Sequence, residues 1–279
     1  MKPVPTTAAR GPLGIPRRSS QVPRFDRLVG ARLYALAVRA LDGKTALVTG
    51  AAGAIGQAVV RAFSDAGAEV FAVDRVQPAA GHAFVGDVTR PQVVERAFDA
   101  ALERYGRLDL VFNGAGISGR SLGDGPVETC SPDAWDAVLE TNLKSVFLCC
   151  KHAVPALRRS GGGAITNLGS VLGLVGAEQF QTHAYAASKG GIVALTRAVA
   201  IAYAHDRIRC NVICPGLIDT PMSERARNDP RVRDRLTELQ PLTGAPGAPE
   251  DVAQAALYLA SAPFVTGAVL PVDGGWTAR

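Results

Sequence analysis

Apolar residues in most of this chain alternate between short continuous runs and longer stretches in which they recur every three or four positions. The short runs indicate buried strands, and the longer stretches indicate helices with one apolar face. Strands are expected at residues 45–48, 69–74, 83–88, 108–113, 164–170, 208–215 and 268–274. Helices are expected from the turn after the first strand to about residue 66, and near 91–105, 132–158, 184–204 and 249–261.

Strands that alternate with helices predict right-handed crossover connections and a parallel sheet covered by helices on both faces. The predicted fold class is therefore α/β, with a single Rossmann-like, doubly wound parallel sheet of about seven strands. This domain is predicted to occupy residues 42–279, and a chain of that length buries enough surface to fold without a metal or disulfide. No uninterrupted apolar run approaches the roughly 20 residues that span a bilayer, so no integral membrane segment is expected.

The first 41 residues form an extension with a different pattern. They hold eight basic side chains and one acidic one, whereas residues 42–279 hold 22 basic and 24 acidic ones. A basic excess confined to an extension is not typical of a nucleic-acid-binding fold, so no nucleic-acid partner is expected. Residues 1–23 are rich in proline and are predicted to be disordered. Apolar residues at helical spacing over 25–40 indicate an amphipathic helix as one interpretation.

Three roles for this extension stay open. The helix could lie on the domain, on a partner or on an anionic membrane. The extension also loosely resembles an organellar transit peptide, because it is rich in arginine and poor in acidic residues. The third alternative is an extension without a function.

The cysteines are odd in number and include no CxxC pair. This usage is typical of small buried residues in a reducing compartment rather than of a disulfide framework or a metal site. A cytoplasmic protein without a metal is therefore expected. The five residues are Cys130, Cys149, Cys150, Cys210 and Cys214.

A segment of small residues, Thr49 to Gly56, follows the first expected strand and leads into the first helix. Small residues allow the backbone to turn sharply, to approach a pyrophosphate and to direct helix N-terminal N–H groups at its negative charge. A tight turn packed for its own sake would use similar residues, but the position between strand and helix favours a dinucleotide site. The cofactor-binding candidates here are Gly50, Gly53, Ile55 and Gly56.

The second expected strand ends at Asp74, 18 residues after Gly56. This separation is near the ~20 residues expected for the carboxylate that holds an adenosine ribose. Because a carboxylate repels a 2′-phosphate, NAD is predicted as the cofactor in preference to NADP. Arg75 could hold such a phosphate if its side chain turned inward, and a solvated residue at a strand end is the alternative interpretation of Asp74.

Tyr185 and Lys189 lie four residues apart in an expected helix, and residues at this spacing share one face. The lysine ammonium can therefore lie near the phenol. A free phenol has a pKa of about 10, and a nearby cation is expected to lower it. The pair is thus a candidate general acid/base, and the alternative is a surface helix whose lysine extends to solvent.

At this point the chain resembles the short-chain dehydrogenase/reductase family over about residues 42–279. The glycine motif of the family, TGxxxGxG, is matched by Thr49, Gly50 and Gly56, whereas Ala54 stands at the middle glycine and follows Gly53. Because alanine is small, cofactor binding is expected to survive with a slightly reshaped turn.

The resemblance implies roles for four catalytic residues. Tyr185 would exchange a proton with the substrate oxygen, and Lys189 would also hold the nicotinamide ribose. Ser170, at the end of an expected strand, would hydrogen-bond the substrate oxygen, although it stands 15 residues before Tyr185, about two more than is usual in the family. Asn142 would support a water relay to the lysine, and a polar residue that kinks the long helix is compatible with that role.

Further matches to the family concern the cofactor. Asp87 and Val88 resemble the pair that brackets the adenine. The segment 113–116 resembles the family's NNAG with Gly as its second residue, so that Asn113 would tie strands together and Ala115 would leave room for the ribose. The segment 215–220 resembles PGxxxT, which holds the carboxamide, and its candidate residues are Pro215, Ile218 and Thr220.

These matches predict an NAD-dependent oxidoreductase that transfers a hydride between nicotinamide and a secondary alcohol or ketone of the polyol, sugar or cyclic alcohol class. One alternative is a 3-oxoacyl-thioester (acyl carrier protein) reductase, which normally uses NADPH. The other is a non-catalytic NAD-binding sensor or scaffold. The resemblance also implies a homotetramer formed through the helices 132–158 and 184–204 and the last strand.

The walls of the substrate site are expected from residues 117–131, 171–184 and 216–246, of which the last resembles a mobile lid. The candidate lining residues carry no convergent set of charges, which favours a largely apolar or polyol substrate. They are Phe180, His183, Leu217 and Met222.

Overall fold

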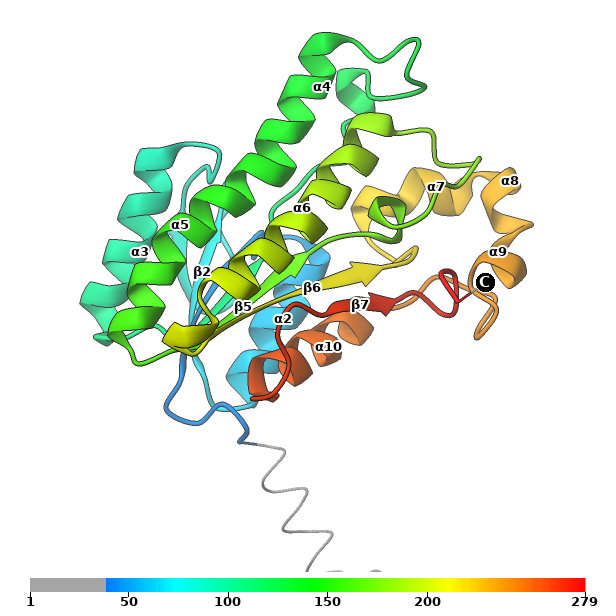
Figure 1. The fold of residues 1–279 in the computed structure, drawn as a ribbon. Coiled ribbons are helices and arrows are strands. Elements are labelled where there is room, and N and C mark those ends of the chain that lie inside the picture. Colours follow the sequence, from blue (N-terminus) through cyan, green and yellow to red (C-terminus); the bar gives the residue numbers. More distant parts are fainter. Residues whose placement is uncertain (1–38, 279) are drawn as a thin grey trace, which may run out of the picture. The chain divides into compact units, whose positions relative to one another are not determined.

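The computed structural model describes residues 39–278. The disorder predicted for residues 1–23, and all but the last two residues of the helix predicted at 25–40, lie outside the described residues. Within them, seven strands form one parallel sheet in the order β3-β2-β1-β4-β5-β6-β7 (Figure 1). The strands are β1 (Thr45–Thr49), β2 (Glu69–Asp74), β3 (His82–Val85), β4 (Leu110–Asn113), β5 (Gly163–Leu168), β6 (Ile208–Pro215) and β7 (Val269–Val272).

The order of the strands reverses at β1, which pairs in parallel with β2 on one side and with β4 on the other. This is the doubly wound arrangement predicted from the alternation of elements, and the prediction is confirmed. The reversal leaves a crevice at the carboxyl ends of the strands. The predicted strands 83–88 and 164–170 end early in the structure, because their last residues leave the sheet and line that crevice.

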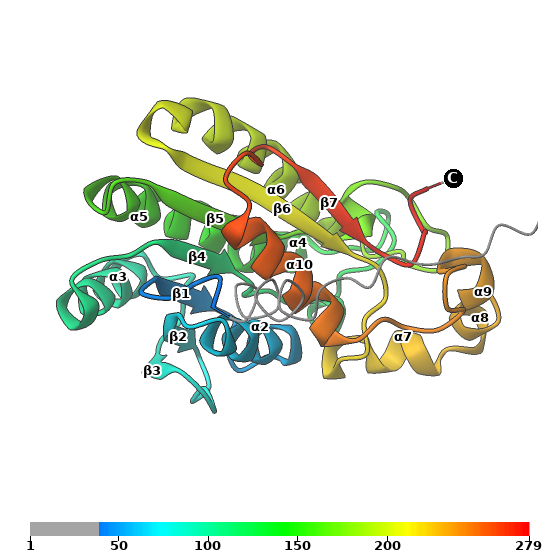
Figure 2. The ribbon, with the colours of Figure 1, turned by 90° about the horizontal axis from the view of Figure 1, so that it is seen from below.

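Helices cover both faces of the sheet (Figures 1 and 2). On one face, α3 (Pro91–Tyr105), α5 (Ser145–Arg159) and α6 (His183–Ala202) pack their apolar residues against the strands. On the other, α2 (Ala54–Asp65) and α10 (Pro249–Ser261) pack against each other and the sheet. All five residues of β1 are buried between the two helical layers, as expected for the central strand of a parallel sheet.

The single helix expected at 132–158 is divided in the structure. It consists of α4 (Pro132–Leu139), a π-helical turn η2 (Glu140–Lys144) and α5. The buried side chain of Asn142 occupies the π turn, where it accepts a hydrogen bond from Ile117 N at 2.8 Å and donates one to Ile117 O at 3.0 Å. Single π turns inside helices are frequent at functional sites.

The segment expected to form a lid, residues 216–246, folds into short helices. They are η5 (Pro221–Ser223), α7 (Glu224–Asn228), α8 (Pro230–Arg233) and α9 (Leu236–Leu239). These helices contribute to a third apolar cluster, separate from the two sheet cores, whose buried members are Val171, Leu217, Val232, Leu236, Leu239 and Trp276. The mobility expected for this segment stays a prediction.

Candidate active site

One large cleft opens at the carboxyl ends of the strands, with a cavity volume of about 1080 Å³. Its cofactor half is lined by the turn after β1, the end of β2 and the residues that follow β3 and β4. Its substrate half is lined by residues that follow β5 and β6, by the loop 117–121 and by Trp276. Location at the point where the strand order reverses is typical of nucleotide sites in open α/β sheets.

The turn between β1 and α2 requires glycine at two positions. Gly50 has a φ of +70°, and a Cβ there would lie 2.6 Å from the backbone of Gly114. A Cβ on Gly56 would collide with the carbonyl of Gly50. Gly53 is the N-cap of α2, and Ile55 in the first helical turn lines the cleft. The cradle therefore fits a pyrophosphate placed against a helix N-terminus.

The Asp74 carboxylate lines the same half of the cleft and is held by two backbone donors. Ala52 N donates to Oδ2 at 3.0 Å, and Val76 N donates to Oδ1 at 3.1 Å. The first of these bonds joins the end of β2 to the glycine turn. Arg75 also lines the cleft.

Asp87 and Val88 follow β3 and line the cleft beside Asp74. Burial raises the pKa of the Asp87 carboxyl. Hydrogen bonds from Thr89 and the positive charges of Arg75 and Arg90 more than offset this, so the pKa lies below its ordinary value. The Asp87 carboxylate is thus held ionised at the edge of the cleft, where it can accept a hydrogen bond from the base of a bound nucleotide.

Asn113, predicted as a cofactor ligand, does not line the cleft. Its side chain is buried behind it, and Nδ2 donates to Asn167 Oδ1 at 2.8 Å, which ties β4 to β5. The next two residues, Gly114 and Ala115, do line the cleft. A side chain on Gly114 would meet the ring of Phe112 at 2.6 Å, which explains why glycine replaces the second asparagine of the family motif.

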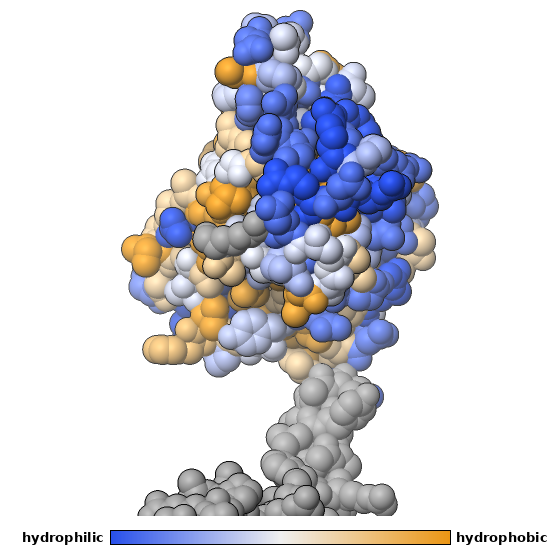
Figure 3. Space-filling model, turned by 90° about the vertical axis from the view of Figure 1, so that its right-hand side faces the viewer, coloured by the Kyte–Doolittle hydropathy of each residue, from blue (hydrophilic) through white to orange (hydrophobic). Residues whose placement is uncertain are grey.

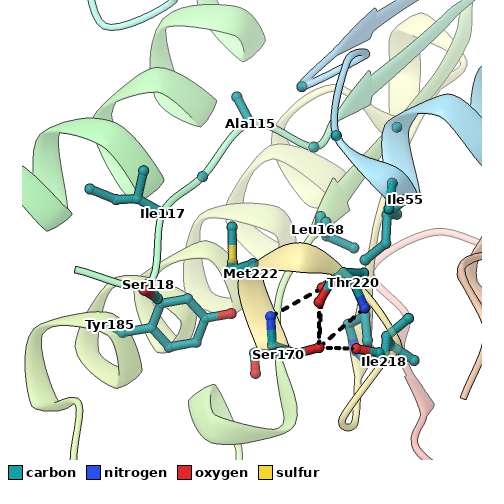
Figure 4. Close-up of a pocket in the computed structure, with 18 of the residues that line it drawn as sticks. Ile55, Ala115, Ile117, Ser118, Leu168, Ser170, Tyr185, Ile218, Thr220 and Met222 are labelled. Atoms are coloured by element: carbon teal, nitrogen blue, oxygen red, sulfur yellow. Dashed lines mark hydrogen bonds between the residues drawn. The ribbon is translucent and has the colours of Figure 1, made fainter. Parts of the chain in front are cut away.

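Ser170, Tyr185 and Lys189 come together in the substrate half, at the end of β5 and on the first two turns of α6. The side chains of Ser170 and Tyr185 form a hydrogen bond. Lys189 Nζ lies 5.5 Å from the centroid of the Tyr185 ring and donates to Leu168 O at 2.8 Å. Figure 4 shows the Tyr185 ring extending into the cleft with its hydroxyl toward Ser170. The extra residues between Ser170 and Tyr185 are accommodated in the irregular segment 174–182.

The expectation that Lys189 lowers the pKa of Tyr185 is wrong for this structure. Burial raises the pKa of the Tyr185 phenol, and the hydrogen bond with Ser170 offsets this only in part. Burial also lowers the pKa of the Lys189 ammonium to about 8. The physical reason is that both groups are desolvated, while the lysine is directed at a backbone carbonyl and not at the phenol oxygen.

Sequence reasoning missed a thiol next to this trio. Cys214, near the end of β6, is fully buried, and its sulfur accepts a hydrogen bond from the backbone of Ser170. Burial raises the pKa of the thiol to about 11, although the positive charge of Lys189 acts in the opposite direction. The thiol therefore stays protonated and packs beneath the site as a small apolar group.

Two side chains hold the elements that carry Ser170, Tyr185 and Lys189 in place. Asn142 does not line the cleft; besides its two bonds to Ile117, its Nδ2 donates to Ser188 Oγ at 3.1 Å. Asp124, also missed by sequence reasoning, accepts hydrogen bonds from Ala184 N at 3.0 Å and Tyr185 N at 2.9 Å. A carboxylate at a helix N-terminus satisfies its unpaired N–H groups and interacts favourably with its dipole. Asp124 therefore fixes the turn of α6 that carries Tyr185.

The segment after β6 closes the cleft from the other side. Pro215, Ile218 and Thr220 line it. The Thr220 side chain accepts a hydrogen bond from Ser223 N at 3.3 Å, and Ser223 Oγ donates to Ile218 O, which makes the capped turn drawn with dashed lines in Figure 4.

Most of the expected substrate walls are present, with one exception. Phe180, Leu217 and Met222 line the cleft, but His183 does not, and its side chain is exposed at the start of α6. Three residues that were not singled out also line the cleft from within the predicted wall segments, namely Arg120, Leu172 and Arg225. Trp276 lines it from outside those segments and belongs to no recognised motif.

Two absences concern the described residues alone. Among residues 39–278, no group of three or more His, Cys, Asp or Glu side chains is arranged to hold a metal ion. Within the same residues, every helix is too short or too polar to cross a membrane.

Comparison with known proteins gives a consistent picture. Residues 50–277 match the family model described as enoyl-(acyl carrier protein) reductase. The chain is 39% identical to cis-4-hydroxycyclohexanecarboxylate dehydrogenase of Sinomonas cyclohexanicum, across 84% of this chain and 97% of that protein. It is 37% identical to 3-oxoacyl-(acyl-carrier-protein) reductase of Thermotoga maritima, across 84% and 98%. A crystal structure titled as a short-chain dehydrogenase/reductase from Burkholderia xenovorans has a TM-score of 0.76 and 34% identity, across 86% and 98%.

Proposed function

Since the chain belongs to the short-chain dehydrogenase/reductase family and is an oxidoreductase acting on CH–OH donors, we propose that it is an NAD-dependent dehydrogenase. Its proposed substrates are secondary alcohols of the cyclic alcohol, polyol or sugar class. The observation that carries this proposal is the Ser170–Tyr185–Lys189 group, which lines the same cleft as a glycine cradle and a ribose-binding carboxylate. A relative that is named as a dehydrogenase of a cyclic alcohol supports the substrate class.

In the proposed reaction, bound nicotinamide supplies or accepts the hydride. The Tyr185 hydroxyl donates a proton to the carbonyl oxygen during reduction and takes one from the alcohol during oxidation. Ser170 is hydrogen-bonded to the same hydroxyl and orients the substrate oxygen beside it. Lys189, whose ammonium lies 5.5 Å from the centroid of the Tyr185 ring, would hold the nicotinamide ribose beside the reacting groups.

The preference for NAD is supported by Asp74. Its carboxylate is fixed by Ala52 N and Val76 N at the end of β2, where it can accept hydrogen bonds from ribose hydroxyls and repels a 2′-phosphate. The second candidate, a 3-oxoacyl-thioester reductase, is favoured by the relative from Thermotoga maritima. A panel of secondary alcohols and a 3-oxoacyl thioester, assayed with both dinucleotides at the nicotinamide absorbance, separates the two.

Replacement of Tyr185 by Phe tests whether the chain is an enzyme or a non-catalytic NAD-binding protein. We expect turnover to fall about a thousandfold, because the group that transfers the proton is lost, while NADH still binds. The exposed Tyr258 on α10 provides the matched control, and Tyr258→Phe is expected to retain full activity. Equal activity of Tyr185→Phe and the unmodified protein would refute the proposed chemistry.

The proposal includes a homotetramer formed through α4, α5, α6 and β7. Large apolar side chains are exposed on the outer surfaces of these helices, namely Trp135, Phe147 and Ile201. Their burial between copies would be favourable. Light scattering should give four times the chain mass of 29.0 kDa, and a Phe147→Glu variant should lower it. A monomer mass for the unmodified chain would contradict this part of the proposal.

A further inference from the structure

Two guanidinium groups line the substrate half of the cleft, and the proposed reaction does not use either of them. Arg120 belongs to a 3₁₀ turn, η1 (Arg120–Leu122), and Arg225 to the first turn of α7. Within residues 39–278, neither side chain makes a hydrogen bond or an ion pair. Arg120 is half-buried and Arg225 is exposed, so both guanidinium groups are free to meet a ligand that enters the cleft.

The acidic residues near this pair are already engaged. The Asp124 carboxylate caps α6 through Ala184 N and Tyr185 N. Asp229 accepts three hydrogen bonds from Arg231, two from the side chain at 2.9 and 3.2 Å and one from the backbone N–H at 3.0 Å. The negative charges of Asp124 and Asp229 favour the Arg120 guanidinium, but neither carboxylate forms an ion pair with Arg120 or Arg225, and burial with repulsion from Arg225 and Arg231 outweighs them.

The two arginines also repel each other. Burial lowers the pKa of the Arg120 guanidinium, and the charge of Arg225 lowers it further. An anion bound beside both side chains would relieve this repulsion and would form charge-assisted hydrogen bonds with them. Figure 3 shows that strongly hydrophilic side chains gather on the face to which α7 and α8 contribute, so an anionic substrate would approach over a polar rim.

Arg120 is held at a fixed place relative to Tyr185. The loop that carries it is tied at one end to Asn142 through both backbone groups of Ile117. At the other end, Asp124 N bonds to Gly119 O at 3.0 Å, and the Asp124 carboxylate bonds to Tyr185 N. The same short loop thus joins a cation to the residue that would exchange the proton.

We propose that Arg120 and Arg225 bind a carboxylate group of the substrate while its hydroxyl or carbonyl oxygen lies between Ser170 and Tyr185. This inference rests on the proposed function and narrows its substrate class to hydroxy acids and the corresponding oxo acids. It modifies the sequence-based expectation of a largely apolar or polyol substrate, which rests on Phe180, His183, Leu217 and Met222 and does not consider the two arginines. Arg guanidinium suits this task because its planar fork matches a carboxylate.

A binding experiment tests the site without relying on turnover. Cyclohexanecarboxylate and cyclohexanecarboxamide have no hydroxyl to oxidise, and their affinities for the NADH-loaded protein can be measured by calorimetry. We expect the carboxylate to bind at least tenfold more tightly than the amide. The variants Arg120→Gln and Arg225→Gln should each weaken carboxylate binding about ten- to a hundredfold, as expected for the loss of a charged hydrogen bond.

The matched control is Arg233→Gln, because Arg233 is exposed on α8 and does not line the cleft. It should bind the carboxylate as the unmodified protein does. Equal affinities for carboxylate and amide, or a ratio unchanged in the two cleft variants, would overturn the proposal. A loss of NADH affinity equal to the loss of carboxylate affinity would assign the arginines to a cofactor phosphate and would also overturn it.

A turnover experiment separates this inference from the proposed function. In the unmodified protein, kcat/KM for 4-hydroxycyclohexanecarboxylate should be more than ten times that for its methyl ester. In Arg120→Gln this ratio should be at least tenfold lower. If the carboxylate binds through Arg120 but neither alcohol is oxidised, the proposed function fails and the anion site stands. If the ester is oxidised as well as the acid in every variant, the anion site fails and the dehydrogenase stands.

Discussion

The two halves of the cleft are built in different ways. The cofactor half is made of backbone at the ends of β1, β2 and β4, packed so closely that a Cβ on Gly50 would touch Gly114. The substrate half is made mainly of side chains from loops and short helices. Its glycines Gly169 and Gly216 are closely packed too, but Gly176, in the segment after Ser170 and outside the cleft lining, has nothing within 4 Å of the place a Cβ would take. The cofactor half therefore has little freedom to vary, whereas the substrate half can change its lining without disturbing the sheet.

The largest effect is expected from a glycine substitution in the cofactor half, compared with one in the open segment beside the substrate half. Gly56→Ala places a Cβ against the carbonyl of Gly50, so it should lower the free energy of unfolding by about 3 kcal/mol and weaken NADH binding more than tenfold. Gly176→Ala should change the free energy of unfolding by less than about 0.5 kcal/mol. Denaturant unfolding and NADH titration of both variants measure the contrast, and similar losses in the two would refute it.

The junction of the halves holds a buried cation, Lys189, with a pKa lowered from 10.5 to about 8. Between these two pH values the unfolded chain binds more protons than the folded one. The cost of burying the charged Lys189 ammonium is therefore fully present below pH 8, and it decreases as the pH rises toward 10.5. Relative to Lys189→Met, the unmodified protein should gain about 2 kcal/mol in free energy of unfolding from pH 7.5 to 10. Parallel stability curves for the two proteins would show that the ammonium is not desolvated.

A smaller effect is expected from the edge of the cofactor half. Asp74→Ala removes the carboxylate that opposes a 2′-phosphate, so the ratio of kcat/KM with NAD to that with NADP should fall about tenfold, or about 1.4 kcal/mol. Asp65→Ala, an exposed aspartate at the end of α2, is the control and should leave the ratio unchanged. An unchanged ratio in Asp74→Ala would remove the support for an NAD preference.

The smallest effect is expected at the residue where the glycine turn departs from the family motif. Ala54 is the first residue of α2, and Ala54→Gly should lower the free energy of unfolding by less than about 1 kcal/mol, because glycine is a poorer helix former. NADH affinity should change by less than about twofold. A large gain in affinity would show that alanine has distorted the turn.

Local patterns were sufficient to predict the sheet, its order of elements and the residues of the cofactor half. Gly56 could be recognised because its role depends on the nearby Gly50, whereas Gly50 and Asp74 were recognised from a motif although their contacts are with the distant Gly114 and Ala52. The pairing of Tyr185 with Lys189 could be recognised because a helix of known period brings them to one face. Asn113 ties β4 to β5 through Asn167, as its motif predicted, but it does so from behind the cleft and does not line the cofactor half to which it was also assigned.

From the sequence alone followed the class of fold, the glycine turn before the first helix and the placement of Tyr185 and Lys189 on one helix face, since each depends on short-range geometry that propensity and periodicity encode. Only the tertiary structure decided the pKa of Tyr185, the capping role of Asp124 and the convergence of Arg120 with Arg225, 105 positions apart in the numbering. These properties depend on burial and on contacts between segments that are distant in the chain, and no local pattern carries that information.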